Sequence, residues 1–66
     1  MANTTTTYTV WSQHTPTGKF LDSKTYDTLE YAQIHYDALS TVDRNSLTRV
    51  VSTKNSNTYT TIHSNY

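Results

Sequence analysis

The segment Asp27–Leu39 is the only stretch of this 66-residue chain with a helical periodicity. Four apolar residues share one side of a wheel drawn at about 100° per residue: Leu29, Ala32, Tyr36 and Leu39. A helix with one apolar side must bury that side against other elements, and the flanking sequence is typical of strands and turns. The sequence therefore predicts a helix at about 28–40 that covers a set of strands.

The start of this helix carries recognisable signals. Asp27 is predicted to be the N-cap, and Glu30, three positions later, completes a capping box. Tyr26 and Tyr31 occupy the positions of a hydrophobic staple, which would set the angle at which the chain enters the helix.

The apolar arc of the helix is wider than one sheet requires. Tyr31, Ile34 and Ala38 lie further round the wheel, with His35 between the two groups. Tyrosine and alanine tolerate water, so this side is either solvated or in contact with a second molecule. His35 is correspondingly either a buried, hydrogen-bonded residue or part of a pH-sensitive interface.

Alternating residues predict a hairpin on each side of the helix. The first is closed at Thr15–Gly18, where Pro16 presets one turn position and Gly18 supplies a left-handed residue. The second follows a loop-like run at 43–46 and turns at 54–57. The four strands are predicted at 6–14, 19–23, 47–53 and 58–64.

The order strand, strand, helix, strand, strand predicts an α+β, two-layer fold: a four-stranded antiparallel sheet with one helix packed on one face. The predicted core is Val10, Tyr8, Leu21, Val51, Ile62, Leu29, Ala32, Tyr36 and Leu39. The opposite face would carry Trp11, Phe20, Val50 and Tyr59 among threonines. A contiguous exposed apolar patch of this kind often marks an interface.

Length and composition favour self-association. Residues 1–66 are predicted to form a single small domain, with residues 1–5 frayed. A domain of this size buries a modest share of its surface, and the absence of cysteine removes disulfides and thiolate metal sites. Oligomerisation is a common remedy, so a homodimer is expected.

The charges exclude some partners. Lys plus Arg equals Asp plus Glu, five of each, whereas a general DNA-binding domain should be basic. All five acids lie between Asp22 and Asp43. No run is apolar and long enough for a signal peptide or a membrane span, which predicts a cytoplasmic protein.

Catalytic and cofactor signatures are missing from the sequence. One glycine cannot build a phosphate-binding loop, and there is no Gly-x-Ser-x-Gly elbow. His14 and His63 would approach each other only if the first and last strands were neighbours, and two histidines without a third ligand are a weak zinc signal. No enzymatic activity, cofactor or metal is expected.

The remaining hypothesis is a protein-interaction module, homodimeric, acting as an accessory or inhibitory protein that occupies a partner's surface, of the sort that phages and mobile elements encode. Its interface candidates lie on the helix and on the open sheet: Tyr31, Ile34, His35, Ala38, Trp11, Phe20 and Tyr59. The alternative is a nucleic-acid platform, in which exposed aromatics stack bases beside Arg49 and Lys54.

Overall fold

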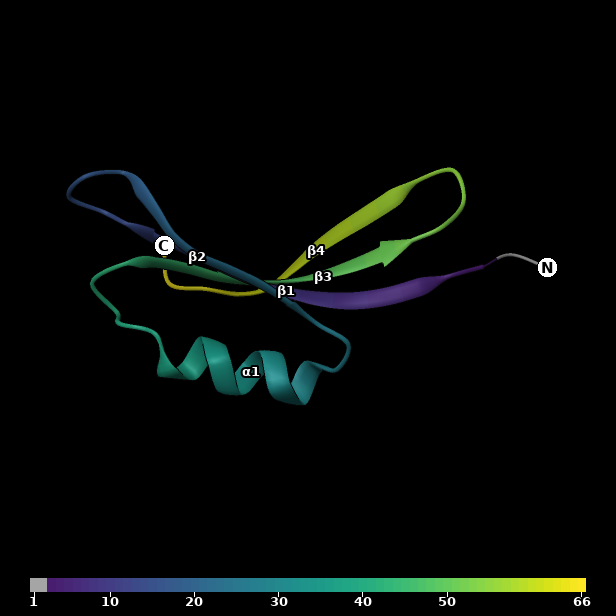
Figure 1. Cartoon of the computed structure of the whole chain (residues 1–66), viewed down its shortest axis with the longest axis horizontal. Helices are drawn as coiled ribbons and strands as arrows, with labels where there is room; N and C mark the ends of the chain where they lie inside the picture. Colours follow the sequence, from purple (N-terminus) through teal and green to yellow (C-terminus); the bar gives the residue numbers. More distant parts are fainter. Residues whose placement is uncertain (1–2) are drawn as a thin grey trace.

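The computed structural model describes residues 3–66 as one antiparallel sheet with a helix on one face (Figure 1). The elements are β1 (Thr5–His14), β2 (Lys19–Tyr26), α1 (Leu29–Ala38), β3 (Arg44–Ser52) and β4 (Asn57–Ser64). The strand order is β2-β1-β3-β4, so each hairpin supplies one central strand and one edge strand. The predicted α+β, two-layer arrangement is confirmed.

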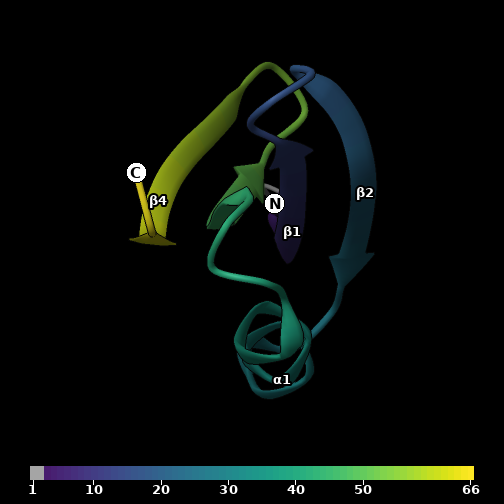
Figure 2. The ribbon, with the colours of Figure 1, turned by 90° about the vertical axis from the view of Figure 1, so that its left-hand side faces the viewer.

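The sheet is longer than the helix that covers it. Ten residues of α1 span about 15 Å, whereas ten residues of β1 span about 33 Å. In Figure 1, α1 lies under one half of the sheet, and the tip of the β3–β4 hairpin projects beyond it. We call this tip, residues 50–59, the arm. Both hairpins bend away from α1, as the end-on view in Figure 2 shows.

The core is small and lies between α1 and the two central strands. Its fully buried hydrophobic residues are Val10, Ala32 and Leu47. Partly buried hydrophobic residues pack around them: Tyr8, Tyr26, Tyr36, Leu39 and Ile62. Six of the nine predicted core residues therefore belong to this cluster, while Leu47 and Tyr26 were missing from the prediction.

Two predicted core residues, Leu21 and Leu29, are 51% and 40% exposed. The position of Leu21 has a clear cause, because the β1–β2 register shifts between Ser12 and Gln13 and leaves Leu21 without a partner. Leu29 is the first residue of α1, where the chain still enters from the edge strand β2. Val51 is half-buried but lies outside the cluster.

A second bulge changes the predicted face of His63. The β3–β4 register shifts between Leu47 and Thr48, so Ile62 is the extra residue and His63 pairs with the core residue Leu47. Strict alternation along the predicted strand 58–64 puts His63 on the same face as Tyr59, and that prediction is wrong because the bulge moves His63 to the helix side. Bulges increase local twist, which accounts for the divergence of the two hairpins in Figure 1.

The N-cap of α1 lies one residue later than predicted. Thr28, not Asp27, is the N-cap, and its hydroxyl accepts from the Tyr31 N–H at 3.5 Å. The predicted Tyr26–Tyr31 staple is also wrong, because Tyr26 ends β2 and packs edge-on against His35. At the other end, Leu39 is the C-cap, so α1 ends two residues before the predicted boundary.

The run predicted as a loop at 43–46 mostly belongs to β3, which begins at Arg44. Asn45 and Ser46 are buried, although such residues usually favour loops. Asn45 is tolerated because both polar atoms of its side chain are hydrogen-bonded: the Ser12 hydroxyl donates to its Oδ1 at 2.7 Å, and its Nδ2 donates to the Ser40 carbonyl at 2.7 Å.

The first hairpin turn follows its prediction. Gly18 has φ 69°, a left-handed conformation, and its N–H donates to the His14 carbonyl at 2.8 Å. Of residues 1–5, which were predicted to be frayed, Thr5 belongs to β1. Met1 and Ala2 lie outside the described residues.

Candidate functional site

The sheet face opposite α1, called the open face, is defined by the strand register. Residues paired directly across antiparallel strands point to the same side. Trp11 pairs with Ser46, and Val50 pairs with Tyr59, while the buried Val10 pairs with Leu47 on the helix side. The predicted faces of β1 and β3 are therefore confirmed.

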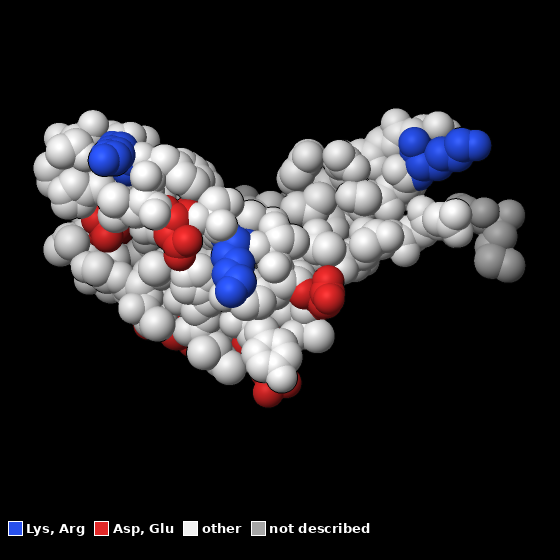
Figure 3. All heavy atoms as spheres, in the orientation of Figure 1, with Lys and Arg blue, Asp and Glu red and all other residues white. Residues whose placement is uncertain are grey.

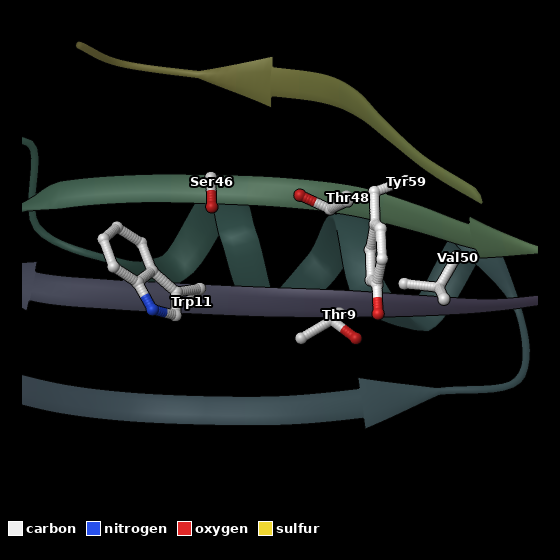
Figure 4. A pocket seen from close by; sticks show the side chains of 6 residues that line it. All are labelled: Thr9, Trp11, Ser46, Thr48, Val50 and Tyr59. Atoms are coloured by element: carbon white, nitrogen blue, oxygen red, sulfur yellow. The ribbon is translucent and has the colours of Figure 1, made fainter. Parts of the chain in front are cut away.

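A groove runs along the open face between the two hairpins. It has a volume of about 280 Å³ and is lined by Thr9, Trp11, Ser46, Thr48, Val50 and Tyr59. Figure 4 shows Trp11 at one end and Tyr59 with Val50 at the other, and the Tyr59 ring passes over β3 toward β1. Small threonine and serine side chains between the two rings leave the space open.

Aromatic residues continue beyond the Trp11 end of the groove. The Trp11 ring lies 5.3 Å from that of Phe20 in an edge contact and 6.1 Å from that of Tyr66. The Arg44 guanidinium lies 5.8 Å from the Tyr66 ring centre. Of these, Phe20 and Tyr66 remain 47% and 65% exposed. Trp11 and Phe20 were predicted to share this face, whereas nothing in the sequence indicated the contribution of Tyr66.

The open face carries very little charge. Among the strand-paired residues, Arg44 is the only one of Asp, Glu, Lys and Arg that the register places there, through its pairing with Gln13. Arg49 pairs with Tyr8 and therefore lies on the helix side. In Figure 3, red atoms lie mainly toward α1, and the notch between the two hairpins is white.

The helix candidates divide into two sets. Tyr31 and Ile34 are 63% and 61% exposed, and Ala38 is also exposed. His35 instead faces β2: its Nε2 lies 2.7 Å from an Asp22 carboxylate oxygen, and its Nδ1 lies 3.0 Å from the Tyr26 hydroxyl. Of the two interpretations of His35, this geometry favours the hydrogen-bonded residue within the fold.

Asp22, His35 and Tyr26 form a carboxylate–imidazole–hydroxyl series, the order found in general-base relays. With the Nε2–H donated to Asp22, Nδ1 of the neutral ring accepts from the Tyr26 hydroxyl. The hydroxyl is phenolic, however, and the groove lies on the opposite face of the sheet. The series joins α1 to the edge strand β2, which is sufficient reason for its presence.

The other two histidines do not come together as a metal site. β3 separates β1 from β4, so His14 and His63 are not on neighbouring strands. His14 lies 2.9 Å from Asp43, and His63 stacks on Tyr36 with ring centres 5.6 Å apart. Within residues 3–66, no group of three or more His, Asp or Glu side chains could hold a metal ion.

No family model, curated protein or solved structure matches this chain. The helix α1, the only one in residues 3–66, is too short to cross a membrane.

Proposed function

We propose that this chain is a cytoplasmic, non-enzymatic protein-interaction module that binds a protein partner through its open face and acts as an accessory or inhibitory protein. One observation carries the proposal: an aromatic-ended groove lies on a face with a single charged strand residue, Arg44. Interface centres are depleted in charge and enriched in Trp, Tyr and Phe, which is the composition of this face.

The groove offers anchors of the kind that dominate binding energy. Trp11 and Tyr59 stand at its two ends, and each can bury a large area at a small cost in side-chain entropy. The threonine and serine hydroxyls between them can satisfy the polar groups of a bound segment without the desolvation cost of a charge. A segment with apolar side chains would therefore fit between the two rings.

Nucleic acid is the less supported partner. Stacking platforms work beside several cations that neutralise phosphate. Arg49, one of the two cations proposed for that role, lies on the helix side of the sheet. Lys54 sits in the turn of the arm, which leaves Arg44 as the one strand cation beside the aromatic residues.

Two aromatic substitutions on opposite sides of the molecule test the proposal. Trp11→Ala should lower the amount of protein partner captured from the native host by about tenfold or more, because an anchor in the groove is lost. Tyr31→Ala, which removes an exposed tyrosine from α1, should leave capture unchanged. Quantitative mass spectrometry measures both, and circular dichroism confirms that each variant is folded.

Loss of capture by Tyr31→Ala, with capture by Trp11→Ala intact, would move the interface to the helix and contradict the proposal. Nucleic acid that co-purifies with the wild type, and is released by salt with the steep dependence of phosphate contacts, would support the platform instead.

A further inference from the structure

The two edge strands differ in how they are protected. β2 carries Lys19, Asp22 and Lys24, and charged side chains on an edge discourage pairing with another chain. β4 has the sequence NTYTTIHS, without an acidic residue, lysine, arginine or proline. All of its residues except Ile62 are exposed, so its outer side is open to solvent.

The backbone of β4 has unpaired groups directed outward. The Thr53 N–H donates to the Ser56 carbonyl at 2.8 Å, which makes these two residues the hydrogen-bonded pair that closes the hairpin. Bonded and non-bonded pairs alternate along an antiparallel ladder, so Thr58 and Thr60 bond to β3. Three residues direct their N–H and C=O away from β3: Asn57, Tyr59 and Thr61.

We propose that β4 pairs antiparallel with β4 of a second copy of this chain, around a two-fold axis that passes through Tyr59. The regular run of β4 before its bulge is 57–61, and Tyr59 is its central residue. Self-pairing of this run opposes Tyr59 to Tyr59 and Asn57 to Thr61, so every outward group finds a partner. An axis between two residues would oppose side chains from different faces, which regular pairing forbids.

The arm makes this contact accessible. Residues 57–59 lie in the part of the sheet that projects beyond α1, so the helix of neither copy obstructs the approach (Figure 1). An axis perpendicular to the sheet keeps both helices on one side and both open faces on the other. The two copies then share one continuous sheet, and β4 is no longer an exposed edge.

The dimer also joins the two grooves. Tyr59 lines the groove of its own copy and would stand beside Tyr59 of the second copy on the same face. This consequence rests on the proposed function, since it makes one extended docking surface from two short grooves. The pairing of β4 itself does not depend on whether the groove binds a partner.

A charged side chain placed at the two-fold axis tests the pairing of β4 with β4. Tyr59→Lys places two like charges directly opposite each other and should raise the dimer dissociation constant by about tenfold or more. Thr25→Lys adds the same charge to the open-face side of the other edge strand and should leave the constant unchanged. Sedimentation equilibrium over a concentration series measures both. A wild-type chain that is monomeric at millimolar concentration, or a Tyr59→Lys variant that associates as tightly as the wild type, would overturn the proposal.

Single cysteines test the position of the axis, because the chain has none of its own. With the axis at Tyr59, the Cα atoms of two Tyr59→Cys residues lie about 5.5 Å apart, within the range of a disulfide. The Cα atoms of two Thr60→Cys residues lie about 8 Å apart and cannot be bridged without backbone movement. In glutathione buffer, Tyr59→Cys should cross-link and Thr60→Cys should not, and the reverse result would contradict this axis.

Failure of the pairing and failure of the docking proposal give different results. If only the pairing is wrong, the chain is monomeric, and Trp11→Ala still loses its partner. If only the docking is wrong, the Tyr59→Lys and cysteine results hold, and Trp11→Ala captures as much protein as the wild type.

Discussion

Leu47→Ala is expected to leave most molecules unfolded at 25 °C. Leu47 is one of three fully buried hydrophobic residues in the part of the chain that the structure describes. Truncation of a buried leucine costs about 2–5 kcal/mol, while a domain of this size has a free energy of unfolding of only about 3–5 kcal/mol. Urea titration followed by circular dichroism should show little or no folded baseline for this variant.

Leu21→Ala is the matched control, since it removes the same atoms from a residue that is 51% exposed. It should lower the free energy of unfolding by less than about 1 kcal/mol. An equal loss for the two variants would place Leu21 in the core and would mean that the bulge at this position is absent.

Asn45→Ala is expected to lower the free energy of unfolding by about 1–3 kcal/mol, a large share of the total. The substitution leaves the buried Ser12 hydroxyl without its acceptor and the Ser40 carbonyl without its donor. Urea titration measures the loss. The loss of stability arises because these buried polar groups lose their hydrogen-bond partners, and only a water molecule entering the site could replace them.

Asn55→Ala, in the exposed turn of the arm, provides the comparison. It should change the free energy of unfolding by no more than about 0.5 kcal/mol. If Asn45→Ala were equally harmless, Asn45 would not be a buried centre of hydrogen bonds, and the early start of β3 would need another explanation.

The sequence predicted the elements because their periodicity is local. The alternation of Tyr8, Val10 and Ser12 put β1 in the correct phase, and Ala32 and Tyr36 identified the inner side of α1. The bulges at Leu21 and Ile62 could not be predicted, because each arises from pairing with another strand and changes no local pattern.

The burial of polar residues was the second feature that could not be predicted from the sequence. Asn45 and Ser46 have loop-forming side chains, and only their tertiary partners make a strand possible at that point. The N-cap was misplaced by one residue for a similar reason, since Asp27 and Thr28 are both good capping residues and the path of β2 decides between them.

The sequence predicted some residues of the open face but neither Ser46 and Tyr66 nor the contacts between the residues. Trp11, Phe20 and Tyr59 could be assigned to one face from strand phase alone. Their arrangement as a groove between diverging hairpins depends on the twist that the bulges introduce. His35 could not be separated from the helix candidates, because its partner Asp22 becomes its neighbour only in the folded sheet.

The most direct test of the open face as the interaction surface is a titration of the isotope-labelled chain with the partner identified by capture, followed by NMR. We expect the signals of the Trp11 indole N–H and of the methyl groups of Thr9, Thr48 and Val50 to shift or broaden, and those of the Ile34 and Ala38 methyl groups to stay unchanged. Changes confined to Ile34 and Ala38 would contradict this expectation and would place the partner on α1.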